Sequence, residues 1–296
     1  ISELLYTNSS VAAVTGATQI ASLDSDGFTL GTSTTYVNES GGSNAYVAWN
    51  WKAGGAASTI AAGSVSTGVP SVASSVSASP ESGFSIVTYT TTGSGDITVG
   101  HGLGKAPEII FGKVRNEAYA WNVFALPIGA TKALGFSNNA ESASVAFGAT
   151  APTTTVFTAG RPGEANMNFE AGNNVVAYCF TSIEGYSKIG TFLAAGGADN
   201  SFIHLGFRPA WFLIKRYNSS GDWVLYDNTR DPVNVGSIRT SPNLNNSDVG
   251  PDASNYGIDF VSNGVKFRSG QGDTAASGGA YIYMAFAEQP FKYANA

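Results

Sequence analysis

Charged residues, cysteine and long apolar runs are all scarce in this chain of 296 residues. Only 12% of the residues are charged, whereas a typical globular domain has about twice that share. The net charge of −6 comes without basic runs, which argues against nucleic acid as a ligand. No run of 18 apolar residues occurs, so the sequence offers no membrane-spanning helix. We therefore expect neither a nucleic-acid partner nor membrane insertion.

Side chains that carry chemistry are equally few. The single cysteine, Cys179, lies in the apolar run 175–180, which predicts a buried core residue rather than a nucleophile. His101 and His204 lie in corresponding loops, and no Gly-x-Ser-x-Gly elbow supplies them with a serine. No phosphate loop, dinucleotide fingerprint or zinc-ligand set occurs. The sequence thus predicts no catalytic residue, no cofactor and no metal.

Glycine and aromatic residues are abundant, with 36 Gly, 17 Phe, 13 Tyr and 5 Trp. This composition is typical of short strands joined by tight turns. Residues 108–114 and 210–216 are continuous apolar strands, and residues 116–119 and 218–222 are the turns of two hairpins. We predict an all-β fold of β-sandwich units of about 105 residues, with a jelly-roll or concanavalin-like topology.

An internal repeat organises the chain. At a constant offset of 102, the matching positions include Phe84 with Tyr186, Leu103 with Leu205, Pro107 with Pro209, Lys113 with Lys215, and Trp121 with Trp223. The second half of the unit occurs three times, from Phe28 to Trp51, from Phe157 to Phe180 and from Val265 to Phe286. We expect two complete units, 83–189 and 190–296, and a partial unit, 1–52, which is the back half of a sandwich.

The partial unit would leave an open core, so either upstream sequence or another chain is expected to complete it. The start on Ile1 suggests processing or an incomplete beginning. Residues 53–82, rich in Ala, Gly, Ser and Thr, are interpreted as a connector. It is either a flexible spacer or an extended segment packed along neighbouring subunits, because Val and Ile residues recur in it: Ile60, Val65, Val69, Val72 and Val76.

Two polar clusters are candidate sites. Asp24-Ser25-Asp26-Gly27 resembles the start of a calcium loop, but position twelve is Thr35 rather than Glu. The third copy has Asn263-Gly264 there, which favours a tight turn. The second cluster comprises Asp222, Asp227, Arg230 and Asp231, and the preceding unit has neutral residues at the matching positions. A salt-linked loop is favoured there, ahead of a sugar or metal contact and of glycoside hydrolysis.

The five tryptophans, Trp49, Trp51, Trp121, Trp211 and Trp223, are expected mainly in cores. Trp121 and Trp223 are the exceptions, because they adjoin loops and could stack on a sugar. The candidate ligand-binding residues are therefore Trp121, Asp222, Trp223, Asp227 and Arg230.

Six stretches resemble a family of bacteriophage virion proteins found in marine phages: 24–31 (DSDGFTLG), 46–55 (YVAWNWKAGG), 83–90 (GFSIVTYT), 99–107 (VGHGLGKAP), 206–211 (GFRPAW) and 281–296 (YIYMAFAEQPFKYANA). The resemblance covers nearly the whole chain. It implies a structural or adhesive virion component with repeated lectin-like sandwich domains, and it carries no catalytic residues. A fuller unit normally precedes the first stretch in that family, and this chain departs from the pattern there.

The expected function is thus a virion structural protein, a tail fibre, spike or head-attached fibre that mediates host-surface attachment. Its expected partners are two further copies in a homotrimer, other virion proteins, and a host-surface glycan or protein, bound through many weak contacts. The alternatives are a capsid or tail decoration protein without a receptor role, a secreted carbohydrate-binding module and, with the weakest support, a glycan hydrolase.

Overall fold

The computed structural model describes residues 3–15, 19–32, 37–39, 44–64, 68–160 and 167–289. Thr35, Val65 and the last seven residues of the stretch 281–296 lie outside these ranges. The described chain is almost entirely antiparallel β-structure, as the composition predicts. Its helical elements are η1 (Leu126–Ile128) and α1 (Ala253–Tyr256). None of the helices in these ranges is long and apolar enough to cross a membrane.

The first sandwich is built on a six-stranded sheet in the order β10-β9-β14-β7-β6-β5. Its strands are β5 (Ser58–Ile60), β6 (Ser74–Ser79), β7 (Phe84–Thr92), β9 (Ile109–Val114), β10 (Asn122–Ala125) and β14 (Ala171–Phe180). A second layer consists of β8 (Ile97–Gly100) paired with β13 (Val156–Ala159). Side chains of both layers form one core, which includes Val99, Phe157 and Cys179. Cys179 is fully buried, as predicted, and burial raises its pKa to about 12.

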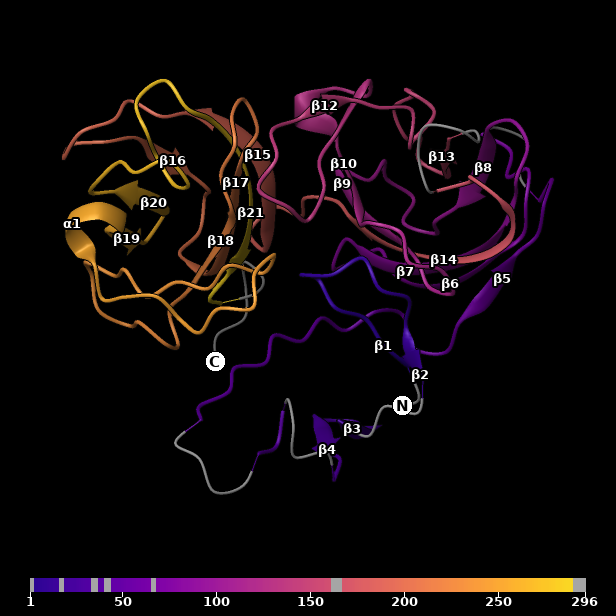
Figure 1. Ribbon diagram of the computed structural model, residues 1–296, viewed down its shortest axis with the longest axis horizontal. Helices are drawn as coiled ribbons and strands as arrows, with labels where there is room; N and C mark the ends of the chain where they lie inside the picture. Colours follow the sequence, from indigo (N-terminus) through magenta and orange to yellow (C-terminus); the bar gives the residue numbers. More distant parts are fainter. Residues whose placement is uncertain are drawn as a thin grey trace.

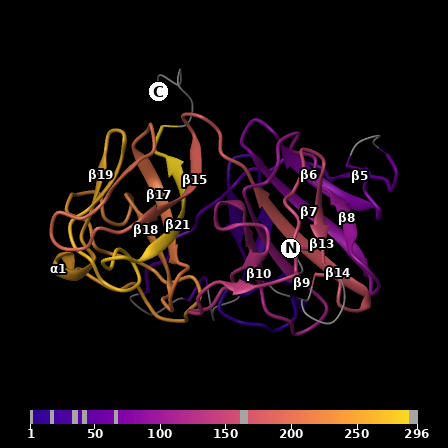
Figure 2. The ribbon, with the colours of Figure 1, turned by 90° about the horizontal axis from the view of Figure 1, so that it is seen from above.

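The second sandwich packs a four-stranded sheet against a three-stranded sheet. The first consists of β15 (Ser187–Leu193), β21 (Ala280–Ala287), β17 (Pro209–Arg216) and β18 (Trp223–Asp227), and the other of β16 (Phe202–His204), β20 (Gly264–Phe267) and β19 (Ile258–Val261). The turns predicted at 116–119 and 218–222 link β9 to β10 and β17 to β18, which pair as hairpins. The two sandwiches lie side by side with their larger sheets facing each other (Figures 1 and 2).

The facing sheets share a third apolar cluster, which explains why their central strands are apolar throughout. Successive side chains of a strand point to opposite faces of the sheet. In β9, Ile110 therefore enters the first core while Ile109 and Phe111 enter the cluster between the sandwiches. In β17, Phe212 enters the second core and Leu213 the shared cluster. Both faces of these strands are buried, so no polar alternation remains in the sequence.

Residues 53–82 are not a flexible spacer where the structure describes them. β5 and β6 extend the first sheet beyond β7, with Ser74 opposite Tyr89 and Val76 opposite Val87. The alternative predicted an extended segment packed along neighbouring subunits. The segment is extended and packed, but it packs on its own sandwich. Its recurrent apolar residues serve this purpose: Val76 is 3% exposed, and Ile60 packs against the first core.

The described residues between 3 and 52 form an arm and not half of a sandwich. The arm contains two short pairs, β1 (Glu3–Leu4) with β2 (Val14–Thr15) and β3 (Ile20–Leu23) with β4 (Phe28–Leu30). Residues 46–51 match the end of β14 in sequence but form no strand. The arm runs along one side of both sandwiches (Figure 1). A strand needs neighbours on the sheet to satisfy its backbone, and the described chain offers this segment none.

Candidate functional site

The arm is fastened to the first sandwich by two buried donors, which together form the first joint. Trp121, which directly precedes β10, donates its indole N–H to the Tyr6 carbonyl of the arm at 2.8 Å. Lys113 of β9 donates its ammonium to the Ser10 carbonyl at 3.3 Å and to its own neighbour, the Val114 carbonyl, at 2.7 Å. Both side chains lie on the face of the sheet that turns away from the first core.

The first sandwich is fastened to the second by the same arrangement, the second joint. Trp223 of β18 donates its indole N–H to the Gly135 carbonyl at 2.8 Å. Lys215 of β17 donates to the Asn139 carbonyl at 2.8 Å and to the Arg216 carbonyl, again its own neighbour, at 2.6 Å. The tryptophan and lysine of each joint are related by the offset of 102 found in the sequence.

The docking segments are equivalent as well. Tyr6 and Ser10 lie in the loop of the β1–β2 hairpin, whereas Gly135 and Asn139 lie in the loop between β11 (Lys132–Ala133) and β12 (Ser142–Ala143). In both hairpins the accepting carbonyls come two and six residues after the last paired residue of the first strand, Leu4 or Ala133. One unit therefore uses a hairpin to dock on the tryptophan and lysine of the next.

Burial of the two lysines is the electrostatic cost of these joints. Lys113 and Lys215 are both 0% exposed, and a buried ammonium must be surrounded by acceptors. Backbone carbonyls supply these here. Loss of hydration lowers the pKa of Lys113, and it lowers the pKa of Lys215 to about 8, although Asp222 and Asp273 act in the opposite direction. The joints therefore depend on solvent being excluded from the ammonium groups.

Lys215→Met is expected to flatten the alkaline rise in stability. The pKa of Lys215 is about 8 in the folded chain and about 10.4 in an unfolded one. Between these values the unfolded chain binds more protons, so this group makes the folded state more stable as pH rises. Urea unfolding of wild type and variant between about pH 8 and 9.5 measures the difference. Lys105→Met, at an exposed position, is the control, and a Lys215→Met profile parallel to wild type would contradict the assignment.

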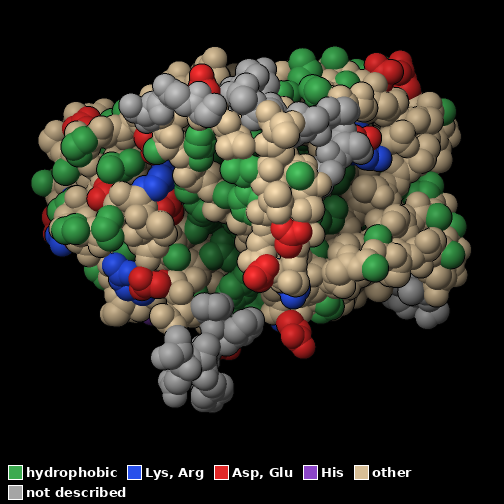
Figure 3. All heavy atoms as spheres, turned by 90° about the horizontal axis from the view of Figure 1, so that it is seen from below, with side chains coloured by type: hydrophobic (Ala, Val, Ile, Leu, Met, Phe, Trp, Pro, Cys, Tyr) green, Lys and Arg blue, Asp and Glu red, His purple; other side chains and the backbone are tan. Residues whose placement is uncertain are grey.

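An aromatic cleft opens between the sandwiches beside the joints. Its volume is about 730 Å³, in the range of small-molecule sites. The walls are apolar side chains of both sheets and of the arm, among them Phe111, Tyr178, Trp211, Trp49 and Trp51. Figure 3 shows hydrophobic side chains gathered in a hollow near the middle of this face.

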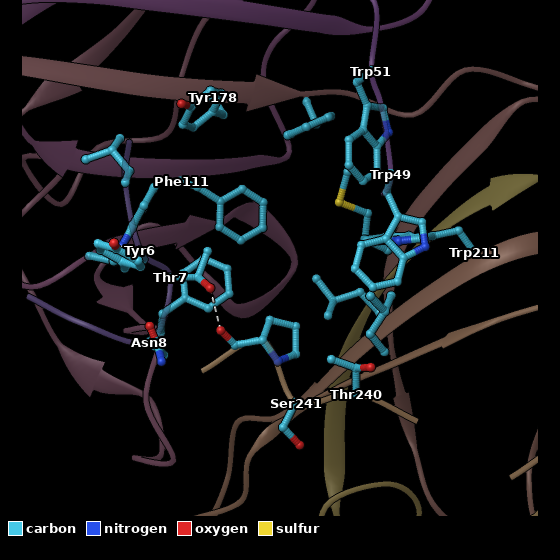
Figure 4. A pocket seen from close by; sticks show the side chains of 18 of the residues that line it. Tyr6, Thr7, Asn8, Trp49, Trp51, Phe111, Tyr178, Trp211, Thr240 and Ser241 are labelled. Carbon is cyan, nitrogen blue, oxygen red and sulfur yellow. Dashed lines mark hydrogen bonds between the residues drawn. The ribbon is translucent and has the colours of Figure 1, made fainter. Parts of the chain in front are cut away.

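Polar groups gather at one end of the cleft. Thr7 and Asn8 of the arm face Thr240 and Ser241 of the second sandwich (Figure 4). The Thr7 hydroxyl donates to the Pro242 carbonyl at 2.5 Å, which closes this end of the cleft. The opposite end carries only aromatic and aliphatic side chains. The cleft can therefore hold a ligand with an apolar body and a polar end.

The two tryptophans proposed as sugar-stacking exceptions have a different role. Trp223 is 1% exposed, and its ring packs against Phe111 and Phe136. Trp121 is 6% exposed, lies in the wall of the cleft, and packs its ring against Phe136 and Tyr178. A stacking platform needs an open ring face, and neither residue offers one because the docked hairpins cover them. Trp121 and Trp223 are thus as buried as the core packing expected of most tryptophans requires, whereas the half-buried Trp49, Trp51 and Trp211 line the cleft.

The charged residues of the predicted set divide into two separate networks. Asp222 accepts a hydrogen bond from the Asn243 side-chain Nδ2 at 2.7 Å, and the Asn243 side-chain Oδ1 accepts the Trp223 backbone N–H at 2.9 Å. Asp227, only 4% exposed, pairs with Arg230. Arg230 also binds Asp248 at 2.6 Å. Both networks brace loops, in agreement with the favoured salt-linked interpretation.

The Arg230 network nevertheless reaches the cleft. The guanidinium lies over the Trp49 ring, 5.3 Å from its centroid, in a cation–π contact. Its Nη1 donates to the Thr240 hydroxyl at 2.6 Å, and Thr240 lines the cleft. Of the predicted charged residues, Arg230 is thus the one that positions cleft side chains.

The calcium-like segment is a hairpin turn, as favoured from the sequence. The Asp24 N–H donates to the Gly27 carbonyl at 2.8 Å, between β3 and β4. Among the residues that the structure describes, no group of three His, Cys, Asp or Glu side chains could hold a metal ion. His204 is exposed at the end of β16, whereas His101 is fully buried beyond β8.

Comparison with protein-family models places the chain in a family. A family model described as a domain of unknown function, DUF7483, matches residues 1–290. No curated protein and no solved structure matches the chain.

Proposed function

The chain belongs to this family, whose function is undefined, and we propose that it is a structural subunit of a bacteriophage virion. In this role it forms part of a tail fibre, spike or head-attached fibre that contacts the host surface. The resemblance of stretches such as 24–31 and 99–107 to marine phage virion proteins supports the proposal. Low charge and a compact, nearly all-β chain suit an extracellular appendage.

The observation that carries the proposal is the pair of equivalent joints. Each joint buries a tryptophan and a lysine whose donors bind the backbone of the preceding unit. Side-chain donors that bind backbone carbonyls fix the orientation of one unit on the next. Such a connection transmits force through the chain, which is what a fibre requires.

The arm supports assembly with further subunits. Thirteen large hydrophobic side chains are exposed in the described residues, and six of these belong to the arm: Val11, Val14, Leu23, Leu30, Tyr46 and Val47. Leu23 is 72% exposed and Tyr46 50%. Exposed apolar side chains on a segment that lies outside both sandwiches suit contacts with a partner. We assign them to contacts with other virion proteins and with two further copies in a homotrimer.

Immunogold labelling of purified particles tests the proposal. Antibodies against the chain are expected to label particles assembled from the genome that encodes it. Labels at a distal tip agree with attachment, and labels over a continuous lattice agree with a decoration protein. Particles that carry neither label nor peptide by mass spectrometry would refute a virion role.

A ligand-binding role for the cleft is the second candidate, because aromatic walls and a polar end suit a glycan with an apolar substituent. On a glycan array the full chain is expected to give signals that Trp49→Ala reduces by at least about tenfold, which corresponds to about 1.4 kcal/mol. Trp49 is half-buried and lines the cleft. Leu193→Ala, at a residue that is 69% exposed and not part of the cleft lining, is the matched control. Equal signals from Trp49→Ala and the control would exclude the cleft.

A further inference from the structure

A third docking hairpin occurs in the second sandwich. The Arg239 N–H donates to the Val249 carbonyl at 3.0 Å, and the Val249 N–H donates to the Arg239 carbonyl at 2.9 Å. This pair corresponds to Leu4 with Val14 and to Ala133 with Ser142. The residue that follows, Thr240, bridges to Leu225 as Leu134 bridges to Val123 in the first sandwich. The segment 239–249 is thus the counterpart of the two hairpins that form the joints.

The first two hairpins each dock on a tryptophan and a lysine, whereas the loop of the third meets the arm, whose Thr7 hydroxyl donates to the Pro242 carbonyl at 2.5 Å. The Ser241 carbonyl of this loop accepts the Leu244 N–H at 2.9 Å, and a carbonyl oxygen can accept a second hydrogen bond. Within the described residues, no tryptophan and lysine pair meets the loop of hairpin 239–249 as Trp121 and Lys113 meet the first hairpin. Residues 244–250 are all exposed, with Leu244 at 37% and Val249 at 40%. The carbonyls two and six residues after Arg239 belong to Ser241 and Asn245, the counterparts of the acceptors in both joints.

We propose that hairpin 239–249 docks on the Trp121–Lys113 socket of a second copy of this chain. The Ser241 and Asn245 carbonyls then accept the indole N–H and the ammonium that the second copy's own arm otherwise engages. The inference rests on the assembly role proposed above and names its partner. Head-to-tail contacts of this kind join different surfaces of the two copies, so they extend into rings or filaments.

The Trp121–Lys113 socket is the one that can open. The hairpin on the Trp223–Lys215 socket is part of the first sandwich and inserts Phe136 between Trp121 and Trp223. The hairpin on the Trp121–Lys113 socket belongs to the arm, in which Val11 is 46% and Val14 39% exposed.

Two hydrogen bonds retain the arm at this socket besides the joint itself: the Ala13 N–H donates to the Arg115 carbonyl at 2.6 Å, and the Thr7 hydroxyl donates to the Pro242 carbonyl at 2.5 Å. Its ion pair, Glu3 with Arg115, joins side chains that are 43% and 30% exposed, and such pairs contribute little. Leu5 packs against the apolar cluster between the sandwiches. The β1–β2 hairpin therefore acts as a plug. Its release exposes Trp121 and Lys113 and leaves the indole N–H and the ammonium without the arm carbonyls that accept them.

Cysteine cross-linking in the full chain tests the contact. In the second joint the Gly221 N–H donates to the Asn138 carbonyl at 2.8 Å; the counterparts in the proposed contact are Tyr119 and Leu244. Leu244→Cys chains are mixed with Tyr119→Cys chains and oxidised. The experiment is done once in the wild-type background and once with Leu5→Asp added to both chains, which releases the plug. The only native cysteine, Cys179, is fully buried and leaves a clean background.

We expect a disulfide-linked heterodimer, several-fold more abundant in the Leu5→Asp background. A synthetic peptide of residues 3–15, added in excess, is expected to suppress it by refilling the socket. Leu193→Cys in place of Leu244→Cys is the control for random collision. A yield no higher than this control, with Leu5→Asp chains folded by circular dichroism and monomeric by light scattering, overturns the proposal. If Leu5→Asp chains do not fold, the wild-type background decides: a heterodimer above the control that peptide 3–15 suppresses supports the contact, and its absence overturns it.

The two tests are independent. Cross-linking without label on particles would leave the contact standing and refute the virion role. Labelled particles without the cross-link would support the virion role and refute the contact.

Discussion

Trp223→Ala is expected to lower the free energy of unfolding by about 3–5 kcal/mol, the range for a buried tryptophan. Trp223 is 1% exposed, and its ring contacts both Phe111 and Phe136 of the first sandwich, which stack on each other. The substitution also leaves the Gly135 carbonyl without its donor. Because this side chain belongs to the second sandwich and its partners to the first, we expect the two sandwiches to unfold in separate transitions. Urea unfolding followed by tryptophan fluorescence and by circular dichroism measures both effects.

Trp223→Phe and Trp49→Ala are the matched variants. The first keeps an aromatic ring and loses the N–H, so a loss of about 1–3 kcal/mol is expected from the unsatisfied carbonyl and the smaller ring. The second removes a half-buried ring from the cleft and is expected to cost less than Trp223→Ala. A Trp223→Ala chain that loses under about 1 kcal/mol and keeps a single transition would show that the joint does not couple the sandwiches.

Acidification is expected to destabilise the chain through His101. Burial lowers the pKa of this imidazole to about 4, although its hydrogen bond to the Thr153 carbonyl acts in the opposite direction. Nδ1 accepts the Leu103 N–H at 3.2 Å, and the other ring nitrogen, Nε2, lies 3.2 Å from the Thr153 carbonyl. This arrangement fits the neutral ring, because a proton on Nδ1 would face another donor.

The sign follows from the two protonation states. The unfolded chain binds a proton at this group near pH 6.5, whereas the folded chain does so near pH 4. The stabilisation is therefore complete above about pH 6.5 and is lost as pH falls to about 4, for a total of about 3 kcal/mol.

The difference between wild type and His101→Gln isolates this contribution, because carboxylates titrate equally in both. Thermal or urea unfolding is measured from pH 7 to pH 4, and the variant, less stable at pH 7, is expected to show the shallower profile. His204→Gln, at the exposed histidine of the corresponding loop, is expected to follow wild type. Parallel profiles for His101→Gln and wild type would contradict the proposed role of burial.

The hairpins β9–β10 and β17–β18 show how much local sequence carries. Their turns, 116–119 and 218–222, lie where polar residues interrupt two apolar runs, and the register follows from the turn. The repeat added the equivalence of Lys113 with Lys215 and of Trp121 with Trp223. It did not reveal their partners, because the accepting groups are backbone carbonyls of Tyr6, Gly135 and others, which every residue has. The accepting carbonyls follow Leu4 and Ala133 at the same spacing, and this equivalence can be recognised only once the hairpins are known.

The sequence by itself determined the all-β class, the main hairpins and the burial of Cys179, because strand periodicity and turn residues act over a few positions. Tertiary structure decided which face of each apolar strand meets its own core and which meets the other sandwich, since both faces are equally apolar. It also decided that Trp223 connects the two sandwiches whereas Trp49 lines the cleft. The reason is that the exposure of a side chain depends on whether segments distant in sequence cover it.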